Sequence, residues 1–236
     1  MSNLAIYAHR GVLTNAPENS MRAFEDAMKE GATGIEFDLQ LTRDKVAIVT
    51  HDLNVERLTK KDALLTDLTF NQVRKLKVKQ PKQKAVNLLS FDTLLKWLVK
   101  ENIPVNIELK ESFIGDVASI ESVVKKCELL SSVHISSFHD EILRVVKWIN
   151  PTLETAFIPT KKFDWQTLGT LDHIDVIHAN KNYYFKQMYW DELKKANKKI
   201  RYYNVLGTEE DLQQVPQEII GWITDFPKRV AEKQRG

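Results

Sequence analysis

Three acidic residues have the spacing of a metal site. Glu36 and Asp38 alternate along the run Ile-Glu-Phe-Asp-Leu, and Glu108 stands in Asn-Ile-Glu-Leu-Lys. Because alternate side chains of a strand point to the same side, Glu36 and Asp38 share a face, where burial is costly unless a cation or another partner is present. All-oxygen ligands favour Mg²⁺ or Ca²⁺ over zinc, because no cysteine and no histidine pair with zinc spacing accompanies them. Taken alone, the three could also be surface carboxylates or salt-bridge partners.

Two histidines add acid–base chemistry to this set. His9, in Ala-His-Arg-Gly, closes one predicted strand, and His51, followed by Asp52, ends another. An imidazole gives or takes a proton near neutral pH, and the guanidinium of Arg10 can hold a phosphate through two parallel hydrogen bonds. Single histidines at strand ends are usually structural, but two of them beside an arginine and three acids favour a functional site.

Short β-branched or aromatic runs alternate with stretches of helical period. The runs are Leu4–Ala8, Gly34–Leu39, Val105–Leu109, Val133–Ser137, Thr155–Ile158, Val176–Ala179, Ile200–Val205 and Gly221–Thr224. Eight such units in 236 residues predict an α/β fold of the (β/α)₈ TIM barrel type, with active-site residues at the C-terminal strand ends. An open doubly wound sheet gives a similar pattern, but no Gly-x-Gly-x-x-Gly follows the first strand.

One further strand, Val46–Thr50, follows the extended run Gly34–Thr42 after only Arg43, Asp44 and Lys45. So short a link predicts an antiparallel hairpin, because a parallel return needs a much longer crossover. With Asp44 and Lys45 as the turn residues, Arg43 pairs with Val46, and His51 then lies opposite Asp38.

Composition restricts the class of protein. The chain is 43 % hydrophobic and 28 % charged with one cysteine, as in a globular protein without disulfides, and we expect a single domain over 1–236. A formal net charge of +2 gives no support for a nucleic-acid partner. No apolar run approaches the ~20 residues of a transmembrane helix, and the N-terminus lacks the pattern of a signal peptide. The expected location is therefore cytoplasmic.

The motifs resemble those of the glycerophosphodiester phosphodiesterase family. They are His9-Arg10-Gly11, Pro17-Glu18-Asn19-Ser20, Ile35-Glu36-Phe37-Asp38, Leu41-Thr42-x-Asp44 and His51-Asp52, then Arg57 with Thr59, Glu108 with Lys110, Ser137-Phe138 and Thr224-Asp225-Phe226-Pro227. The resemblance implies a TIM barrel with a short insertion after the His51-Asp52 strand. It also implies catalytic His9 and His51 and a divalent metal ion, Mg²⁺ or Ca²⁺, held by Glu36, Asp38 and Glu108.

The resemblance further implies which residues meet the substrate. Arg10 and Lys110 would bind the phosphate, and Phe138 and Tyr203 would belong to the substrate-binding wall, although Tyr203 stands where the family usually has tryptophan. The other histidines are expected to be structural: His134, His139, His173 and His178. Glu18 and Asn19 are candidates to support the site, and Asn19 could equally cap a helix.

The implied reaction is hydrolysis of a glycerophosphodiester to sn-glycerol 3-phosphate and an alcohol, through a cyclic phosphate. We expect His9 to act first as base and His51 as acid, with the order open. One alternative is a phospholipase of C or D type, including lysophospholipase D. The other is a non-catalytic barrel that binds phosphoglycerol groups. The head group, the choice between Mg²⁺ and Ca²⁺ and the oligomeric state are left open.

Overall fold

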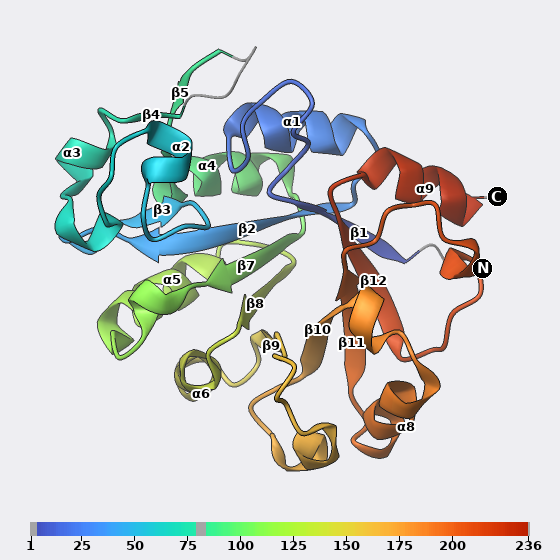
Figure 1. Ribbon diagram of the computed structural model, residues 1–236. Coiled ribbons are helices and arrows are strands. Elements are labelled where there is room, and N and C mark those ends of the chain that lie inside the picture. Colours follow the sequence, from blue (N-terminus) through green and yellow to red (C-terminus); the bar gives the residue numbers. More distant parts are fainter. Residues whose placement is uncertain (1–3, 79–83, 236) are drawn as a thin grey trace.

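Eight parallel strands close into a barrel in the computed structural model, which describes residues 4–78 and 84–235 (Figure 1). They are β1 (Ala5–His9), β2 (Gly34–Leu41), β7 (Val105–Leu109), β8 (Val133–Ser137), β9 (Glu154–Phe157), β10 (Val176–Asn180), β11 (Lys199–Tyr203) and β12 (Ile219–Thr224). The strands follow one another around the barrel in chain order, and β1 pairs with both β12 and β2. The predicted TIM barrel is confirmed, and the open doubly wound sheet is wrong.

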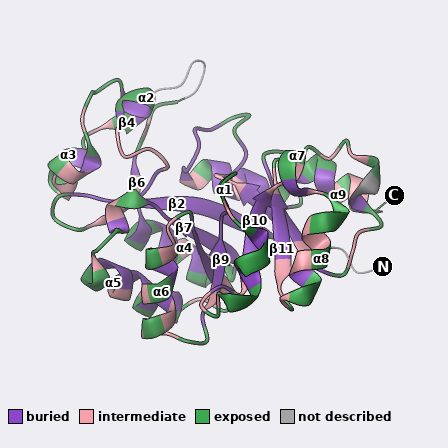
Figure 2. Ribbon diagram, turned by 60° about the horizontal axis from the view of Figure 1, so that its bottom comes forward, coloured by how far each residue is buried: buried purple, intermediate pink, exposed green. Residues whose placement is uncertain are grey.

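Helices surround the barrel between its strands. They are α1 (Met21–Lys29), α4 (Phe91–Glu101), α5 (Val117–Cys127), α6 (Asp140–Ile149), α7 (Lys181–Tyr184), α8 (Gln187–Lys195) and α9 (Pro227–Arg235), with 3₁₀ segments η2 (Glu111–Phe113), η3 (Trp165–Thr170) and η4 (Glu210–Leu212). Ser20 and Ser90 cap α1 and α4 by accepting backbone N–H bonds. Figure 2 shows buried strands within helices whose outer faces are exposed. No helix of the described segments is long and apolar enough to cross a bilayer.

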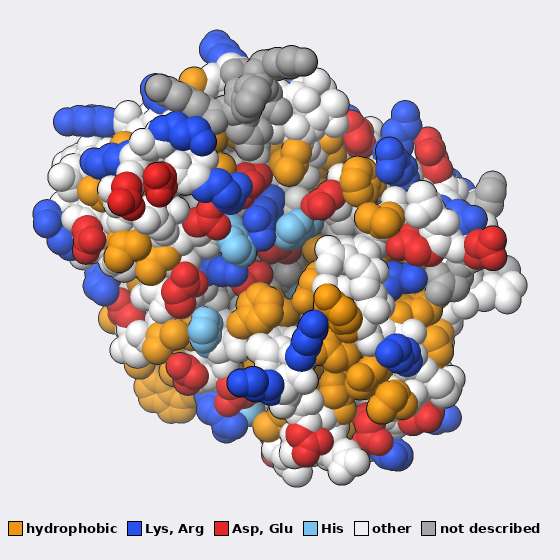
Figure 3. All heavy atoms as spheres, in the orientation of Figure 1, with side chains coloured by type: hydrophobic (Ala, Val, Ile, Leu, Met, Phe, Trp, Pro, Cys, Tyr) orange, Lys and Arg blue, Asp and Glu red, His pale blue; other side chains and the backbone are white. Residues whose placement is uncertain are grey.

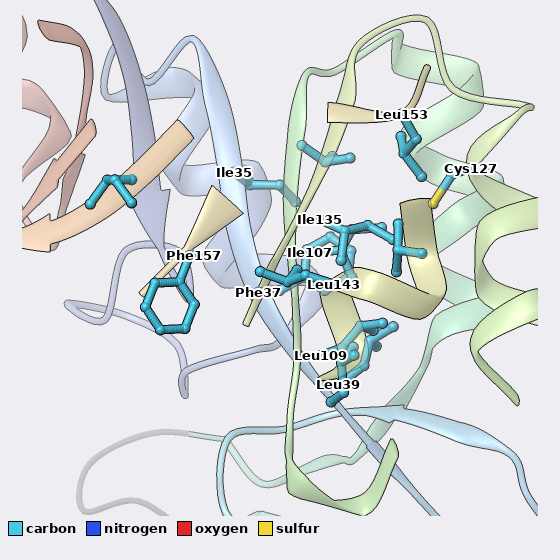
Figure 4. Close-up of a cluster of buried hydrophobic side chains, with 14 of the residues drawn as sticks. Ile35, Phe37, Leu39, Ile107, Leu109, Cys127, Ile135, Leu143, Leu153 and Phe157 are labelled. Atoms are coloured by element: carbon cyan, nitrogen blue, oxygen red, sulfur yellow. The ribbon is translucent and has the colours of Figure 1, made fainter. Parts of the chain in front are cut away.

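The hydrophobic core lies between the barrel and its helices. Side chains on the outer face of the strands, such as Phe37 and Ile107, pack with α5 and α6 residues such as Cys127 and Leu143 (Figure 4). The barrel interior beneath its C-terminal end is instead polar. Tyr7, His134, His178 and Arg201 are in contact there, with ring centroids 5.2 Å apart for both Tyr7–His134 and His134–His178. Gly34 leaves room for Tyr7, because a Cβ atom at position 34 would lie 2.8 Å from the Tyr7 ring.

The predicted insertion follows the hairpin and packs as a small unit at one side of the barrel. It contains α2 (Glu56–Thr59), η1 (Leu65–Asp67), α3 (Phe70–Val73), β4 (Lys77–Val78) and β5 (Val86–Asn87). Its apolar side chains, including Leu58, Leu65 and Val73, form their own buried cluster against Ile48 of the hairpin. The chain then returns through β6 (Leu89–Ser90), which pairs with the outer hairpin strand.

The hairpin itself corrects the predicted register. β3 (Ala47–Val49) pairs antiparallel with β2, but Thr42 rather than Arg43 lies opposite Val46 and donates to its carbonyl at 3.0 Å. The turn therefore has three residues, and Lys45 adopts a left-handed φ of 62°. Asp44 fixes this turn, since its carboxylate accepts from the Thr42 hydroxyl and from the Phe70 backbone.

This register also changes the environment of His51. The Thr50 backbone donates to the Asp38 carbonyl, so Thr50 takes the place that the prediction gave to His51. The prediction that His51 lies opposite Asp38 is wrong by one residue. His51 instead follows the end of the paired strand, where its carbonyl accepts from the Gln40 amide at 3.1 Å.

We predict that Gly34→Ala destabilises the barrel, because a Cβ atom there would lie 2.7 Å from the Pro104 carbonyl oxygen and 2.8 Å from the Tyr7 ring. The free energy of unfolding in urea should fall by about 1–3 kcal/mol. Gly169→Ala is the control, since its Cβ would meet its nearest neighbour at 4.0 Å. Equal stability of the two variants would contradict the crowding of the barrel interior.

Candidate active site

A cavity of about 200 Å³ opens at the C-terminal end of the barrel. Its lining comes from most of the barrel strands and from the chain after the hairpin: His9, Arg10, Glu36, His51, Asn106, Glu108, Phe138, Ile158, His178, Tyr203, Asn204 and Ile223. Figure 3 views this end, where histidine, acidic and basic side chains meet in a central hollow and hydrophobic surface borders it on the side of β10 and β11. The cavity therefore combines charged groups with one apolar wall.

The three predicted carboxylates converge at this cavity. Asp38 and Glu108 are direct neighbours across β2 and β7, and Glu36 precedes Asp38 on the same face. Oxygen atoms of all three lie within 4.8 Å of one another, and all three residues are buried. Burial, together with the charge of Asp38, raises the pKa of Glu36 to about 8 and that of Glu108 to about 7. Asp38 Oδ1 accepts no hydrogen bond from the residues described. The cluster thus has more negative charge than its neighbours compensate.

Two basic side chains supply part of the missing positive charge. Arg10 Nε lies 3.1 Å from Asp38 Oδ2, and Lys110 Nζ lies 2.6 Å from Glu108 Oε1 and 3.8 Å from Asp38 Oδ1. The backbone brings Arg10 inward by a left-handed turn, with φ of 56° at Arg10 and 85° at Gly11. A Cβ atom on Gly11 would lie 2.6 Å from the backbone of Ala23, so only glycine fits this turn. Both residues predicted to bind phosphate therefore lie beside the acidic cluster.

His9 is held by a carboxylate from the other end of the chain. Its Nδ1 lies 2.7 Å from Asp225 Oδ1, because β1 and β12 are neighbours in the closed barrel. Burial alone would lower the pKa of His9, but the hydrogen bond with Asp225 and the charge of Glu36 outweigh it and raise that pKa. With Nδ1 bound to Asp225, Nε2 is the nitrogen that can exchange a proton with a bound ligand.

His51 is held in the same way by its neighbour in sequence. Its Nδ1 lies 2.7 Å from Asp52 Oδ1, and Asp52 also accepts from Arg57 Nε. Both terminal nitrogens of Arg57 donate to the buried Glu18 at 2.7 Å, and Glu18 lies 3.5 Å from Arg10. This chain of ion pairs connects the insertion, which carries Arg57, to the loop that positions Arg10.

The remaining predicted residues differ in their position relative to the cavity. Phe138 and Tyr203 line the cavity, and the Lys110 ammonium lies 5.5 Å from the centre of the Phe138 ring. Asn19 supports the site by donating to Asp38 Oδ2 at 3.2 Å, whereas the helix cap is Ser20. His173 instead pairs with Asp140 away from the cavity, as expected of a structural residue.

Sequence reasoning missed three features of the site. It quoted Asp225 and Arg57 within motifs without giving either a role, and it took His178 as ordinary structure although His178 lines the cavity. Asp225 lies 216 residues from His9, and Arg57 lies 39 residues from Glu18, so the sequence does not reveal these two contacts.

Comparison with known proteins agrees with the predicted family. The sequence model of the glycerophosphoryl diester phosphodiesterase family matches residues 9–229. The protein YqiK of Bacillus subtilis is 28 % identical over 235 residues, which are 96 % of this chain and 96 % of that protein. A glycerophosphodiester phosphodiesterase of Bacillus altitudinis is 32 % identical over 160 residues, 65 % of the length of each chain.

Solved structures agree in fold. A glycerophosphodiester phosphodiesterase of Agrobacterium tumefaciens superposes with a TM-score of 0.82 at 21 % identity, covering 97 % of this chain and 99 % of that one. A phosphodiesterase of Oleispira antarctica in complex with the product sn-glycerol-3-phosphate gives 0.83 at 20 % identity, with 98 % and 97 % covered. Since the family match spans nearly the whole barrel and contains the acidic cluster and both histidines, this chain belongs to the glycerophosphoryl diester phosphodiesterase family.

Proposed function

We propose that the protein hydrolyses glycerophosphodiesters to sn-glycerol 3-phosphate and an alcohol, using a divalent metal ion and two histidines. The observation that carries this proposal is one cavity that holds His9 and His51, each paired with a carboxylate, beside a buried acidic cluster. Family membership supports it, as do the activity of the Bacillus altitudinis glycerophosphodiester phosphodiesterase and the complex of the Oleispira antarctica phosphodiesterase with the product sn-glycerol-3-phosphate.

The acidic cluster fits a hard divalent cation. Glu36, Asp38 and Glu108 would hold it with oxygen atoms alone, as Mg²⁺ and Ca²⁺ prefer. Asp38 Oδ1 accepts no hydrogen bond in the described part of the chain, and burial, followed by the charge of Asp38, raises the pKa of Glu36 and of Glu108. A bound cation supplies charge neutralisation to the phosphate oxygens of the substrate.

Side chains of the protein bind the phosphate and transfer the protons of the reaction. Arg10 and Lys110 bind the non-bridging phosphate oxygens. One histidine takes the proton from the 2-hydroxyl of the glycerol group, whose oxygen then attacks phosphorus, while the other gives a proton to the departing alcohol oxygen. The product of this step is a cyclic phosphate, which water opens as the histidines exchange roles. We keep His9 as first base and His51 as first acid.

A lysophospholipid is a second candidate substrate. The apolar wall formed by Phe138, Ile158 and Ile223 offers contact to the acyl chain that such a substrate carries on its glycerol group. The competing activity would be that of a lysophospholipase D.

A substrate panel tests the proposed function. The purified protein is given glycerophosphocholine, glycerophosphoethanolamine, glycerophosphoglycerol or a lysophospholipid with Mg²⁺ or Ca²⁺. The measured product is sn-glycerol 3-phosphate for the three water-soluble diesters and lysophosphatidic acid for the lysophospholipid. We expect release from at least one water-soluble diester, with none in excess chelator and recovery when the ion is restored. Turnover of the lysophospholipid alone would favour the second candidate. Turnover that is unchanged in excess chelator would contradict a role for the metal ion in the reaction.

We predict that His9→Ala and His51→Ala each lower kcat at least about 100-fold, because each removes a group that transfers a proton in both half-reactions. His139→Ala is the control, since His139 lies outside the cavity lining and should leave kcat within a few-fold of the wild type. Circular dichroism checks that each variant is folded. Near-normal turnover by either cavity variant would refute the role of that histidine.

We predict that Mg²⁺ or Ca²⁺ raises the melting temperature of the chelator-treated protein. An ion at about 100 times its Kd stabilises by about 2.7 kcal/mol, which is about 5–10 °C for a chain of this size. Glu36→Gln should abolish the rise, whereas Glu218→Gln, a buried glutamate outside the acidic cluster, should keep it. A wild-type melting temperature that neither ion changes would count against a cation at the cluster.

A further inference from the structure

The floor of the cavity contains two buried polar side chains that the proposed reaction does not use. Asn106 and His178 both line the cavity and are 2 % and 1 % exposed. Asn106 precedes Glu108 by two residues on β7 and shares its inward face, one step deeper in the barrel. Both side chains are neutral, so the groups that they contact determine which of their atoms donate and which accept hydrogen bonds.

Contacts with Arg201 and Glu154 fix the proton position on His178. Arg201 Nη1 donates to Glu154 Oε1 at 2.7 Å and lies 3.5 Å from His178 Nε2. An arginine has no acceptor, so His178 Nε2 must accept, and the single proton of the neutral ring must sit on Nδ1. Burial and the charge of Arg201 both lower the pKa of His178 well below its usual range, which keeps the ring neutral. Edge-to-face packing with His134, at 86°, holds the ring plane.

The protonated Nδ1 of His178 in turn decides which way the Asn106 amide faces. Nδ1 lies 3.4 Å from the amide atom of Asn106 that is assigned as Nδ2, but an N–H donor at Nδ1 requires the amide oxygen as its partner at that place. The oxygen and nitrogen of an amide exchange places on a half-turn, and hydrogen bonding selects between them. The other polar atom of the Asn106 amide has no hydrogen bond to the described residues. When the oxygen faces His178, the NH₂ group occupies this unpaired position. Asn106 then has a donor left for an oxygen atom of a ligand.

The surroundings of this donor suit a hydroxyl group better than a phosphate. Arg10, Lys110 and the two half-exposed catalytic histidines lie nearer the cavity mouth, where the phosphate and the departing alcohol must be. Asn106 and His178 at the floor are neutral, and the cation beside them, Arg201, is already paired with Glu154. A phosphate there would lose its hydration without an unpaired cation to replace it. The part of a glycerophosphodiester that remains is the end of the glycerol group.

We infer that Asn106 donates a hydrogen bond to the terminal hydroxyl of the glycerol group, and that His178, held by Arg201, is the positioning residue for this amide. The inference rests on the proposed function and deepens it, because it assigns selectivity for a glycerol ester over other 2-hydroxyalkyl esters. A ligand that lacks the terminal hydroxyl leaves a buried N–H without a partner, and sites of this kind reject such analogues strongly.

The test compares two substrates that differ only at this hydroxyl. One is sn-glycero-3-phosphocholine, and the other is its 1-deoxy analogue, which keeps the attacking 2-hydroxyl and ends in a methyl group. We expect the wild type to prefer the glycerol ester at least about tenfold in kcat/KM. Asn106→Leu should reduce the preference to within about threefold, mainly by losing activity toward the glycerol ester.

Two further variants separate this role from a general effect on the barrel. His178→Phe keeps a ring of similar size but loses the hydrogen bond, so it should raise KM for the glycerol ester and leave the deoxy substrate within a few-fold. Ser136→Ala changes another buried interior side chain, which lies beside Glu108 on β8 outside the cavity lining, and should keep the full preference.

A measurement on the wild-type protein covers the case in which Asn106→Leu does not fold. Nitrogen-15 NMR of the histidine side chains should show His178 with its proton on Nδ1. The Asn106 side-chain NH₂ resonances should shift with sn-glycerol 3-phosphate and not with its 1-deoxy analogue. Equal wild-type rates on both substrates, an unchanged preference in Asn106→Leu or a proton on His178 Nε2 would overturn the inference while leaving the phosphodiesterase proposal intact. Hydrolysis of neither substrate, together with no hydrolysis of any diester of the panel, would overturn both.

Discussion

The structure is organised around the cost of placing three carboxylates together inside a barrel. Glu36, Asp38 and Glu108 lie within 4.8 Å of one another and away from water, and like charges so close cannot all ionise without positive charge nearby. Arg10 and Lys110 provide some of it, and their own positions depend on the same cluster. In the proposed function a divalent cation would provide the rest, and the metal site and the phosphate site would then coincide at one point.

The geometry of the barrel strands brings the three carboxylates and their partners together. The two-residue period of β2 puts Glu36 and Asp38 on one face, and parallel register with β7 adds Glu108 beside them. Barrel closure between β1 and β12 brings Asp225 to His9, while the insertion brings Arg57 to Asp52 and Glu18. Two imidazoles from separate segments therefore each have a carboxylate partner and a free nitrogen at the same cavity.

The sequence predicted the features that depend on local period and on motifs. Outward Phe37 and inward Glu36 and Asp38 follow from strand alternation, and the barrel follows from repeated βα units. The hairpin register did not follow, because the left-handed Lys45 turn depends on a contact between Asp44 and the distant Phe70.

The partner of Asp225 and the role inferred for Asn106 could not be predicted from the sequence for a similar reason. Asp225 meets His9 only once the barrel closes, and the orientation of the Asn106 amide depends on a chain of contacts through three other strands. Such interactions produce no regular pattern along the sequence, so hydrophobic or polar periodicity cannot predict them.

The most direct test of the central claim is an anomalous difference map from crystals of the protein grown with Mn²⁺, which substitutes for Mg²⁺ at oxygen sites. The account predicts one strong peak at about 2.0–2.6 Å from oxygen atoms of Glu36, Asp38 and Glu108 together. No peak at the cluster, with Mn²⁺ bound elsewhere on the barrel or not at all, would contradict it.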